Sequence, residues 1–143
     1  MKNNKHSSVS LEEIPYEATW GIRHQVLWPS KELDYVKLAS DPKGHHYGIQ
    51  INDKLVSVIS LFVEGESAQF RKFATLPEEQ GKGYGSILLQ HVMKQAQALG
   101  ATQLWCNARV ETCAFYHRFG MVEKGRGFKK GNIPYVVMER RLP

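Results

Sequence analysis

Long apolar runs are absent from this chain of 143 residues, because Ser57 and Ser60 interrupt its most hydrophobic stretch, residues 55–63. A membrane-spanning helix needs about 20 consecutive apolar residues, so we expect no membrane contact. The first ten residues also lack the apolar segment of a secretory signal. We therefore expect a cytoplasmic protein.

Cysteine is scarce as well, with Cys106 and Cys113 alone. Two cysteines cannot hold a disulfide scaffold together, and their spacing matches no zinc motif, so we expect no metal site. A buried, reduced cysteine behaves as a small apolar side chain, which is the interpretation favoured for Cys106. Motifs typical of zinc proteases, serine hydrolases and calcium loops are missing too.

No repeat, low-complexity tract or linker divides the sequence. Its content of 42% hydrophobic residues suffices to fill a core, and its length fits one domain of about 100–150 residues. We expect a single domain over residues 1–143. Residues 1–7 are expected to be disordered, because they are polar and terminal.

Positive charge is unevenly distributed along the chain. The net charge is +5, yet residues 1–123 carry as many acidic as basic side chains. The excess comes from Lys124, Arg126, Lys129, Lys130, Arg140 and Arg141. A nucleic-acid-binding domain more often spreads basic residues along one face, interleaved with aromatic ones, so we expect no nucleic-acid partner.

Apolar spacing and turn signals predict a mixed α/β (α+β) domain. Helices are expected at residues 16–27, at 31–39 with Ser30 as the cap, after the loop at 81–85 as far as Leu99, and at 111–119. Strands are expected at 46–51, 55–63, 68–75, 103–108, 121–124 and 134–140, with a turn at 52–54 and a flexible loop at 125–132. The central strand–helix–strand unit should form a right-handed parallel crossover.

A glycine-rich segment, Gln-Gly-Lys-Gly-Tyr-Gly-Ser at residues 80–86, separates the strand ending at Thr75 from the long helix. Glycine permits positive φ and close approach of a ligand, and the unpaired amides of a first helical turn attract anions. Ser86 breaks the dinucleotide fingerprint, and the P-loop pattern is absent. The residues alone predict a phosphate or pyrophosphate cradle, with a plain strand-to-helix turn as the alternative.

Residues 73–86 resemble the acetyl-CoA-binding motif of the GNAT superfamily of N-acetyltransferases, Q/R-x-x-G-x-G/A between a strand and a helix. The resemblance continues through Trp105–Arg109 and Ala114–Met121, and residues 23–29 look like the first-helix segment of small bacterial members. It implies a GNAT-like mixed, mostly antiparallel sheet with a splayed parallel strand pair and helices on both faces. It also implies acetyl-CoA as the acyl donor and direct transfer to an amine in a ternary complex.

The same resemblance assigns the cofactor-binding residues. Backbone groups of Phe73, Ala74 and Thr75 would pair with the pantetheine arm, Asn107 would hydrogen-bond it, and Phe115 would pack along it. The pyrophosphate would lie on the loop residues Gln80, Gly81, Lys82, Gly83, Tyr84, Gly85 and Ser86. Leu76 and Glu79 replace an Asp and an aromatic residue that are common in the family, which alters the rim of the cradle.

Tyr116 matches the family's frequent general acid, which would contact the cofactor and protonate the departing CoA thiolate. The alternative is a core aromatic residue with its hydroxyl bonded to a neighbour. A backbone amide of Ala74 or Thr75 could polarise the thioester carbonyl.

The general base stays open. Glu64 and Glu66, at the end of a strand, are the leading candidates, with a solvated hairpin end as their alternative. His24, His45 and His46 have suitable ordinary pKa values, but their spacing does not place them. A water chain would need no dedicated base.

The sequence therefore predicts an acetyl-CoA-dependent N-acetyltransferase acting on an unidentified small-molecule or peptide amine. Residues 20–40 and 125–134 would select this amine, and their basic and aromatic side chains favour one that carries a carboxylate. The alternative function is an acyl-CoA-binding module that senses or scaffolds without turnover. The tolerated acyl length and the oligomeric state are open, with a homodimer as one option.

Overall fold

The computed structural model describes residues 8–143, so the disorder expected for residues 1–7 lies outside it. Contacts divide the chain into two compact units. The first unit combines the chain up to Ser60 with Lys72–His91, and the second combines Leu61–Arg71 with Val92–Pro143. No helix within the described residues is long and apolar enough to cross a membrane.

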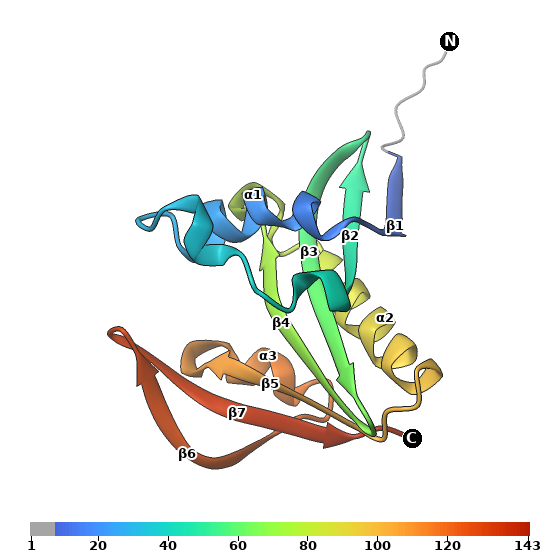
Figure 1. The fold of residues 1–143 in the computed structure, drawn as a ribbon, viewed down its shortest axis with the longest axis vertical. Helices are drawn as coiled ribbons and strands as arrows, with labels where there is room; N and C mark the ends of the chain where they lie inside the picture. Colours follow the sequence, from blue (N-terminus) through green and yellow to red (C-terminus); the bar gives the residue numbers. More distant parts are fainter. Residues whose placement is uncertain (1–7) are drawn as a thin grey trace. The chain divides into compact units, whose positions relative to one another are not determined.

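Seven strands of the described chain form one sheet in the order β1-β2-β3-β4-β5-β7-β6 (Figure 1). They are β1 (Val9–Glu13), β2 (His45–Ile51), β3 (Lys54–Glu64), β4 (Ser67–Thr75), β5 (Gln103–Arg109), β6 (Val122–Lys130) and β7 (Ile133–Arg141). Strands β4 and β5 are parallel, while β1–β2, β5–β7 and β6–β7 are antiparallel. The predicted mixed, mostly antiparallel sheet with one parallel pair is confirmed.

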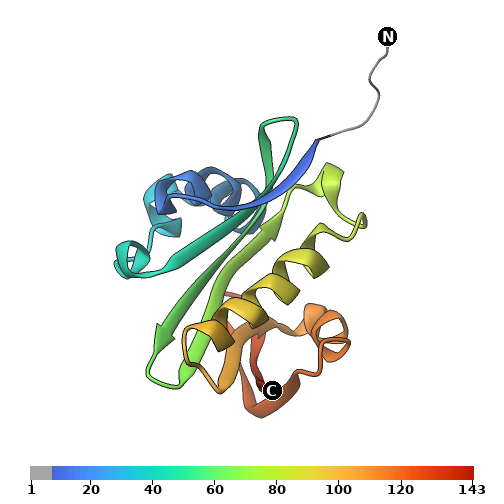
Figure 2. The ribbon, with the colours of Figure 1, turned by 90° about the vertical axis from the view of Figure 1, so that its right-hand side faces the viewer.

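Within the first unit, helical turns and the start of α2 (Tyr84–Ala98) lie on opposite sides of the strands (Figure 2). The turns are η1 (Tyr16–Thr19), α1 (Trp20–Ile22), η2 (Arg23–Leu27), η3 (Leu33–Val36) and η4 (Asp41–Lys43). The predicted turn between β2 and β3 is confirmed, because Asn52 and Asp53 both have positive φ, as a tight hairpin requires.

Three predictions for individual elements are wrong. Strand β1 was not expected, and residues 31–39 form no helix beyond the 3-10 turn η3, which Ser30 does not cap. In that segment Val36 is buried but Leu33 and Tyr35 are exposed, so no apolar stripe supports a longer helix. The loop expected at 125–132 is largely strand, because β6 pairs with β7 across a bulge that accommodates the irregular stretch between Lys124 and Phe128.

The second unit contains the end of β3, the start of β4, and β5, β6 and β7, together with the C-terminal half of α2, η6 (Val110–Thr112) and α3 (Cys113–His117). Its core side chains are Leu61, Ala68, Val92, Ala96, Leu104, Met121 and Met138, each fully buried. Gly120 follows α3 with a φ of 81°, a conformation common just past the end of a helix.

Candidate active site

The glycine-rich loop begins where β4 ends. The amide of Leu76 donates to the Val56 carbonyl at 2.9 Å, which ties this strand end to β3. A 3-10 turn, η5 (Pro77–Glu79), then leads to Gly81 and Gly83, whose φ values are 79° and 90°. Residues with a side chain rarely adopt such angles, so glycine at these two positions follows from the turn itself.

The backbone of this loop has room for a ligand. A Cβ atom added at Gly81 or Gly83 would meet no other atom within 4 Å. The amide of Ile87 donates to the Gly83 carbonyl at 3.1 Å, and the amides of Tyr84–Ser86 therefore precede the hydrogen-bonding pattern of α2. Free first-turn amides beside open glycine backbone are an arrangement that suits an anion.

Lys82, one of the predicted loop residues, forms an ion pair within the loop. Its ammonium lies 3.0 Å from a carboxylate oxygen of Glu79, three residues earlier. The ammonium donates a hydrogen bond to this carboxylate, which raises the pKa of Lys82. The charge of Lys82 is thus balanced locally, and any attraction of an anion falls mainly to the backbone amides.

The end of β4 is held by side chains on two sides. Gln80 donates from Nε2 to the Thr75 carbonyl at 3.0 Å, which bridges the loop and the strand. The hydroxyls of Ser57, on β3, and Thr75 lie 2.7 Å apart. Both contacts fix the residue that the family resemblance places beside the pantetheine arm.

Strand β4 is irregular just before these residues. Lys72 has a φ of 55°, which is uncommon for a residue other than glycine and costs about 1–2 kcal/mol. The parallel ladder joins Ser67–Gln69 to Gln103–Trp105, whereas β5 pairs with β7 along its whole length. Residues 73–75 and Asn107 therefore lie past the end of the described parallel ladder, as expected for a splayed pair.

The second unit carries Asn107, Phe115 and Tyr116. Asn107 is exposed on β5, while Tyr116 is buried in α3 at 8% exposure. The Tyr116 ring lies 5.4 Å from that of Phe115 and 5.7 Å from that of Phe70, measured between centroids. Packing against two rings fixes the orientation of the Tyr116 side chain.

Burial raises the pKa of Tyr116, and the nearby thiols of Cys106 and Cys113 raise it further. Burial likewise raises the pKa of Cys106 to about 12. Neither cysteine is in a disulfide, and both are buried, which confirms that Cys106 acts as a small core residue. The phenol is thus neutral across the physiological pH range and can donate a hydrogen bond.

The candidate bases Glu64 and Glu66 lie at the end of β3 and in the turn before β4, which is the strand end that the sequence predicted. The Glu66 carbonyl accepts hydrogen bonds from the amides of Thr102 and Gln103, at the start of β5. Asn107 lies about 13 Å from Gln103 along this strand at 3.3 Å per residue. The role of either carboxylate as a base stays a prediction.

The three histidines have other partners in the first unit. His24 contacts the Lys31 carbonyl, and His45 lies 3.4 Å from Glu13. His46 is buried, with Nε2 at 2.9 Å from the Asp41 carbonyl and Nδ1 at 2.7 Å from the Ser60 hydroxyl. None of these contacts gives a histidine the role of a base.

His46 belongs to a buried polar network that sequence reasoning missed. Arg23 donates to both carboxylate oxygens of Asp41, at 2.8 and 2.9 Å, and to Ser60 at 2.9 Å. Trp20 and the Leu38 amide also donate to Asp41. The signal that could have indicated this network was Arg23, a charged residue within the helix predicted at residues 16–27. The network joins the helical turns to β2 and β3.

Comparison with known proteins assigns the chain to a family. A model of the acetyltransferase (GNAT) family matches residues 9–121. An uncharacterized N-acetyltransferase of Bacillus subtilis is 28% identical over 144 residues, which cover 94% of this chain and 97% of that protein.

Solved structures share the fold. A crystal structure from Lactobacillus plantarum, assigned as an N-acetyltransferase, has a TM-score of 0.84 at 17% identity and covers 97% of this chain and 100% of its own. A GNAT family acetyltransferase from Elizabethkingia anophelis, solved with acetyl-CoA bound, has a TM-score of 0.71 at 16% identity and covers 94% of this chain and 98% of its own. The chain therefore belongs to the GNAT family of acetyltransferases.

Proposed function

We propose that this protein is an N-acetyltransferase that uses acetyl-CoA and transfers its acetyl group directly to an amine. The observation that carries the proposal is the loop before α2. There, Gly81 and Gly83 leave the backbone open, next to the first-turn amides of the helix. Such a cradle suits a pyrophosphate, and a family relative has been solved with acetyl-CoA bound.

The cofactor-binding residues fall into two groups in this proposal. The backbone of Phe73, Ala74 and Thr75 and the loop residues 80–86 belong to the first unit. Asn107, Phe115 and Tyr116 belong to the second unit. The first group would bind the pyrophosphate and the arm, and the second would bind the arm and act at the sulfur.

When bound, acetyl-CoA supplies an activated acetyl thioester. A backbone amide of Ala74 or Thr75 would donate to its carbonyl oxygen. A bond forms between the amine nitrogen and the acetyl carbon, the bond from this carbon to sulfur breaks, and the nitrogen gives up a proton. Since the described site offers no dedicated carboxylate or histidine, we assign this proton to water.

Tyr116 would stabilise the departing sulfur. Its pKa is raised from the ordinary value of about 10, whereas an alkyl thiol has a pKa of about 8.5. Complete proton transfer from phenol to thiolate is therefore uphill. A hydrogen bond from the phenol to the thiolate needs no such transfer, and is the role that the pKa favours. The proton that completes the thiol can come from solvent after release.

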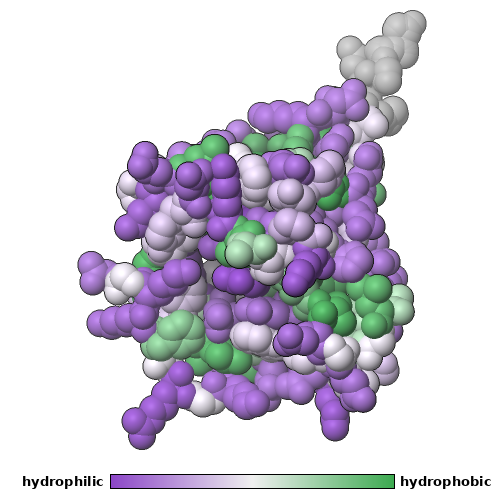
Figure 3. Space-filling model, viewed as in Figure 1, coloured by the Kyte–Doolittle hydropathy of each residue, from purple (hydrophilic) through white to green (hydrophobic). Residues whose placement is uncertain are grey.

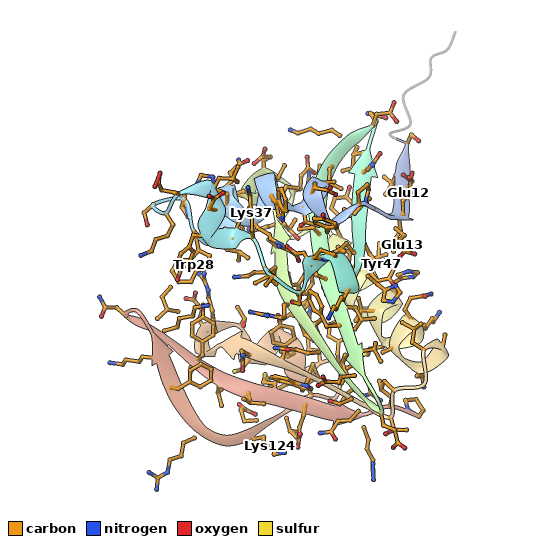
Figure 4. The ribbon with its side chains drawn as sticks, viewed as in Figure 1. Glu12, Glu13, Trp28, Lys37, Tyr47 and Lys124 are labelled. Carbon is orange, nitrogen blue, oxygen red and sulfur yellow. The ribbon has the colours of Figure 1, made fainter. Side chains whose placement is uncertain are left out.

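The decisive variant is Tyr116→Phe, which removes the hydroxyl and keeps the ring. We expect kcat for acetyl-CoA with a panel of amines to fall at least tenfold, since removing one hydrogen-bond donor to a charge that develops during the reaction costs about 10²–10³-fold in kcat. The Kd of acetyl-CoA should stay within twofold. Tyr47→Phe is the matched control, because Tyr47 is also buried, with a pKa raised to about 12, but belongs to β2 (Figure 4). A rate within twofold of wild type for Tyr116→Phe would contradict the assigned role.

Binding without turnover is the competing function. A thermal-shift series with CoA and acetyl-CoA tests the cradle, because a ligand at 100 times its Kd adds about 2.7 kcal/mol to the stability. Release of free CoA in the presence of an amine then separates the enzyme from a sensing module. Absence of any shift at millimolar acetyl-CoA would contradict both functions.

A further inference from the structure

The hydroxyls of Ser57 and Thr75 form a pair that the proposed reaction does not use. Ser57 is fully buried on β3, and its oxygen lies 2.7 Å from Oγ1 of Thr75 and 3.4 Å from the Ala74 carbonyl oxygen. Thr75 is partly exposed at the end of β4. The pair thus connects the interior with the surface at the strand end.

The two distances indicate which hydroxyl donates. If Thr75 donated to Ser57, the Ser57 proton would have to use the Ala74 carbonyl, at a distance beyond the usual 2.5–3.0 Å of such bonds, or about 0.4 Å too long. If Ser57 donates to Thr75, the buried proton is used in a short bond. The Thr75 proton then has no partner among the described residues and is available to a ligand.

Strand alternation gives the face on which this proton lies. Ser60 and His46 bond each other on the face covered by the helical turns, so Ser57 and Tyr47 lie on the other face. The ring of Tyr47 is 4.8 Å from that of His91, which shows that α2 covers this second face. Thr75, bonded to Ser57, therefore lies on the side of the helix whose N-terminus forms the cradle.

We propose that the Thr75 hydroxyl, oriented by Ser57, donates a hydrogen bond to the pantetheine arm of the acyl-CoA. The arm carries amide carbonyls, which are the acceptors that a single hydroxyl donor suits. Thr75 would be a binding residue and Ser57 a positioning residue. This inference rests on the proposed function, because it assigns a further contact to the same cofactor.

The restricted χ1 angle of Thr75 supports a hydroxyl donor whose direction is set before a ligand binds. A β-branched side chain in a strand has few accessible χ1 rotamers, so Ser57 has only to select one for Thr75. On the backbone side, Gln80 already donates to the Thr75 carbonyl at 3.0 Å. The residue is therefore fixed at both its polar groups before a ligand arrives, which lowers the entropic cost of binding.

The test compares two ligands, CoA and adenosine 3′,5′-bisphosphate, which lacks the pantetheine arm. Thr75→Val replaces the hydroxyl with a methyl group of similar size. We expect it to raise the Kd of CoA about three- to tenfold, the range for one neutral hydrogen bond, and to leave the Kd of the bisphosphate unchanged. Thr75→Ser should restore CoA binding, and Ser57→Ala should weaken CoA binding alone.

Controls separate the possible failures. Gly83→Ala, within the cradle, should weaken both ligands, and urea midpoints should show that every variant is folded. Two outcomes would overturn the assigned contact and leave the proposed function intact. In the first, wild type and Thr75→Val bind CoA with the same Kd. In the second, Thr75→Val raises the Kd of CoA and of the bisphosphate by the same factor. Wild-type protein that binds neither ligand would overturn the proposed function and this contact with it.

Discussion

The two units bury ionisable side chains by opposite means. In the first unit, the side chains of Arg23 and Asp41 are 0% and 1% exposed, and they form an ion pair. Burial by itself would raise the pKa of Asp41, but hydrogen bonds from Arg23, the Leu38 amide and Trp20 outweigh it, and its pKa lies below the ordinary value. Pairing and hydrogen bonding hold these charges in the interior.

The second unit buries Cys106, Cys113 and Tyr116, which are neutral side chains when protonated. Burial raises the pKa of all three, so each retains its proton. The first cluster holds its charges through an ion pair and several hydrogen bonds, whereas the side chains of the second cluster stay neutral. The comparison teaches that the Arg23–Asp41 cluster stabilises the fold of the first unit. The second cluster keeps the Tyr116 hydroxyl protonated at the proposed reaction site.

Asp41→Ala should produce the largest effect. It leaves Arg23 charged, buried and without its carboxylate, which costs about 3–5 kcal/mol of unfolding free energy. Urea denaturation of the whole protein measures this change. Asp34→Asn is the control, because Asp34 is exposed and pairs with Lys37 at the surface. Equal urea midpoints for Asp41→Ala and wild type would show that the network contributes nothing to stability.

Cys106→Ser should have an intermediate effect. The hydroxyl would be as buried as the thiol, which is 2% exposed and makes no described hydrogen bond, and an unsatisfied buried hydroxyl costs about 1–3 kcal/mol. Cys106→Ala separates the cost of a cavity from the cost of polarity. If the serine variant is as stable as wild type, the surroundings of Cys106 are not as apolar as its raised pKa indicates.

The smallest effect concerns pH. Burial lowers the pKa of His46 despite the opposing influence of Asp41, so the folded protein binds its proton less readily than the unfolded chain. As pH falls below about 6.5, the unfolded chain takes up this proton first, and stability decreases by at most about 1.4 kcal/mol per pH unit. Urea midpoints between pH 7 and pH 5 measure the slope.

His46→Gln should flatten that slope, and His45→Gln should not, because His45 is a partly exposed neighbour that lies beside Glu13. Nearby charges include Arg23, Asp41 and His45, and only Arg23 and His45 lower the pKa of His46. An identical slope in wild type and His46→Gln would exclude His46 as its source.

Local chemistry explains what the sequence could predict. The loop between β4 and α2 follows from the φ angles that Gly81 and Gly83 must adopt, and these depend on neighbours in the chain. The family pattern depends on the same short-range features. The roles of Tyr116 and Asn107 within that pattern stay predictions.

Long-range pairing explains what the sequence could not predict. The Glu66 carbonyl accepts hydrogen bonds from the amides of Thr102 and Gln103, which place Glu66 beside the start of β5. These residues are more than 35 positions apart in the sequence. The Arg23–Asp41 pair likewise joins residues that are separated by 18 positions. Strand β6 has no buried residue, so it lacks the alternation that marks a strand, and beyond the predicted residues 121–124 it is recognised only by its pairing with β7.

Strand β6 also explains the uneven charge of the chain. It is the last strand in the sheet order, and it carries Lys124, Arg126, Lys129 and Lys130. Hydrophilic side chains project from the surface around this strand (Figure 3), and Lys124 is labelled among its side chains in Figure 4. An exposed sheet edge can recruit strands from other molecules, and lysines and bulges on that edge discourage such recruitment. The positive charge at this end of the sequence thus serves colloidal stability, keeping separate copies of the protein from joining edge to edge as their concentration rises.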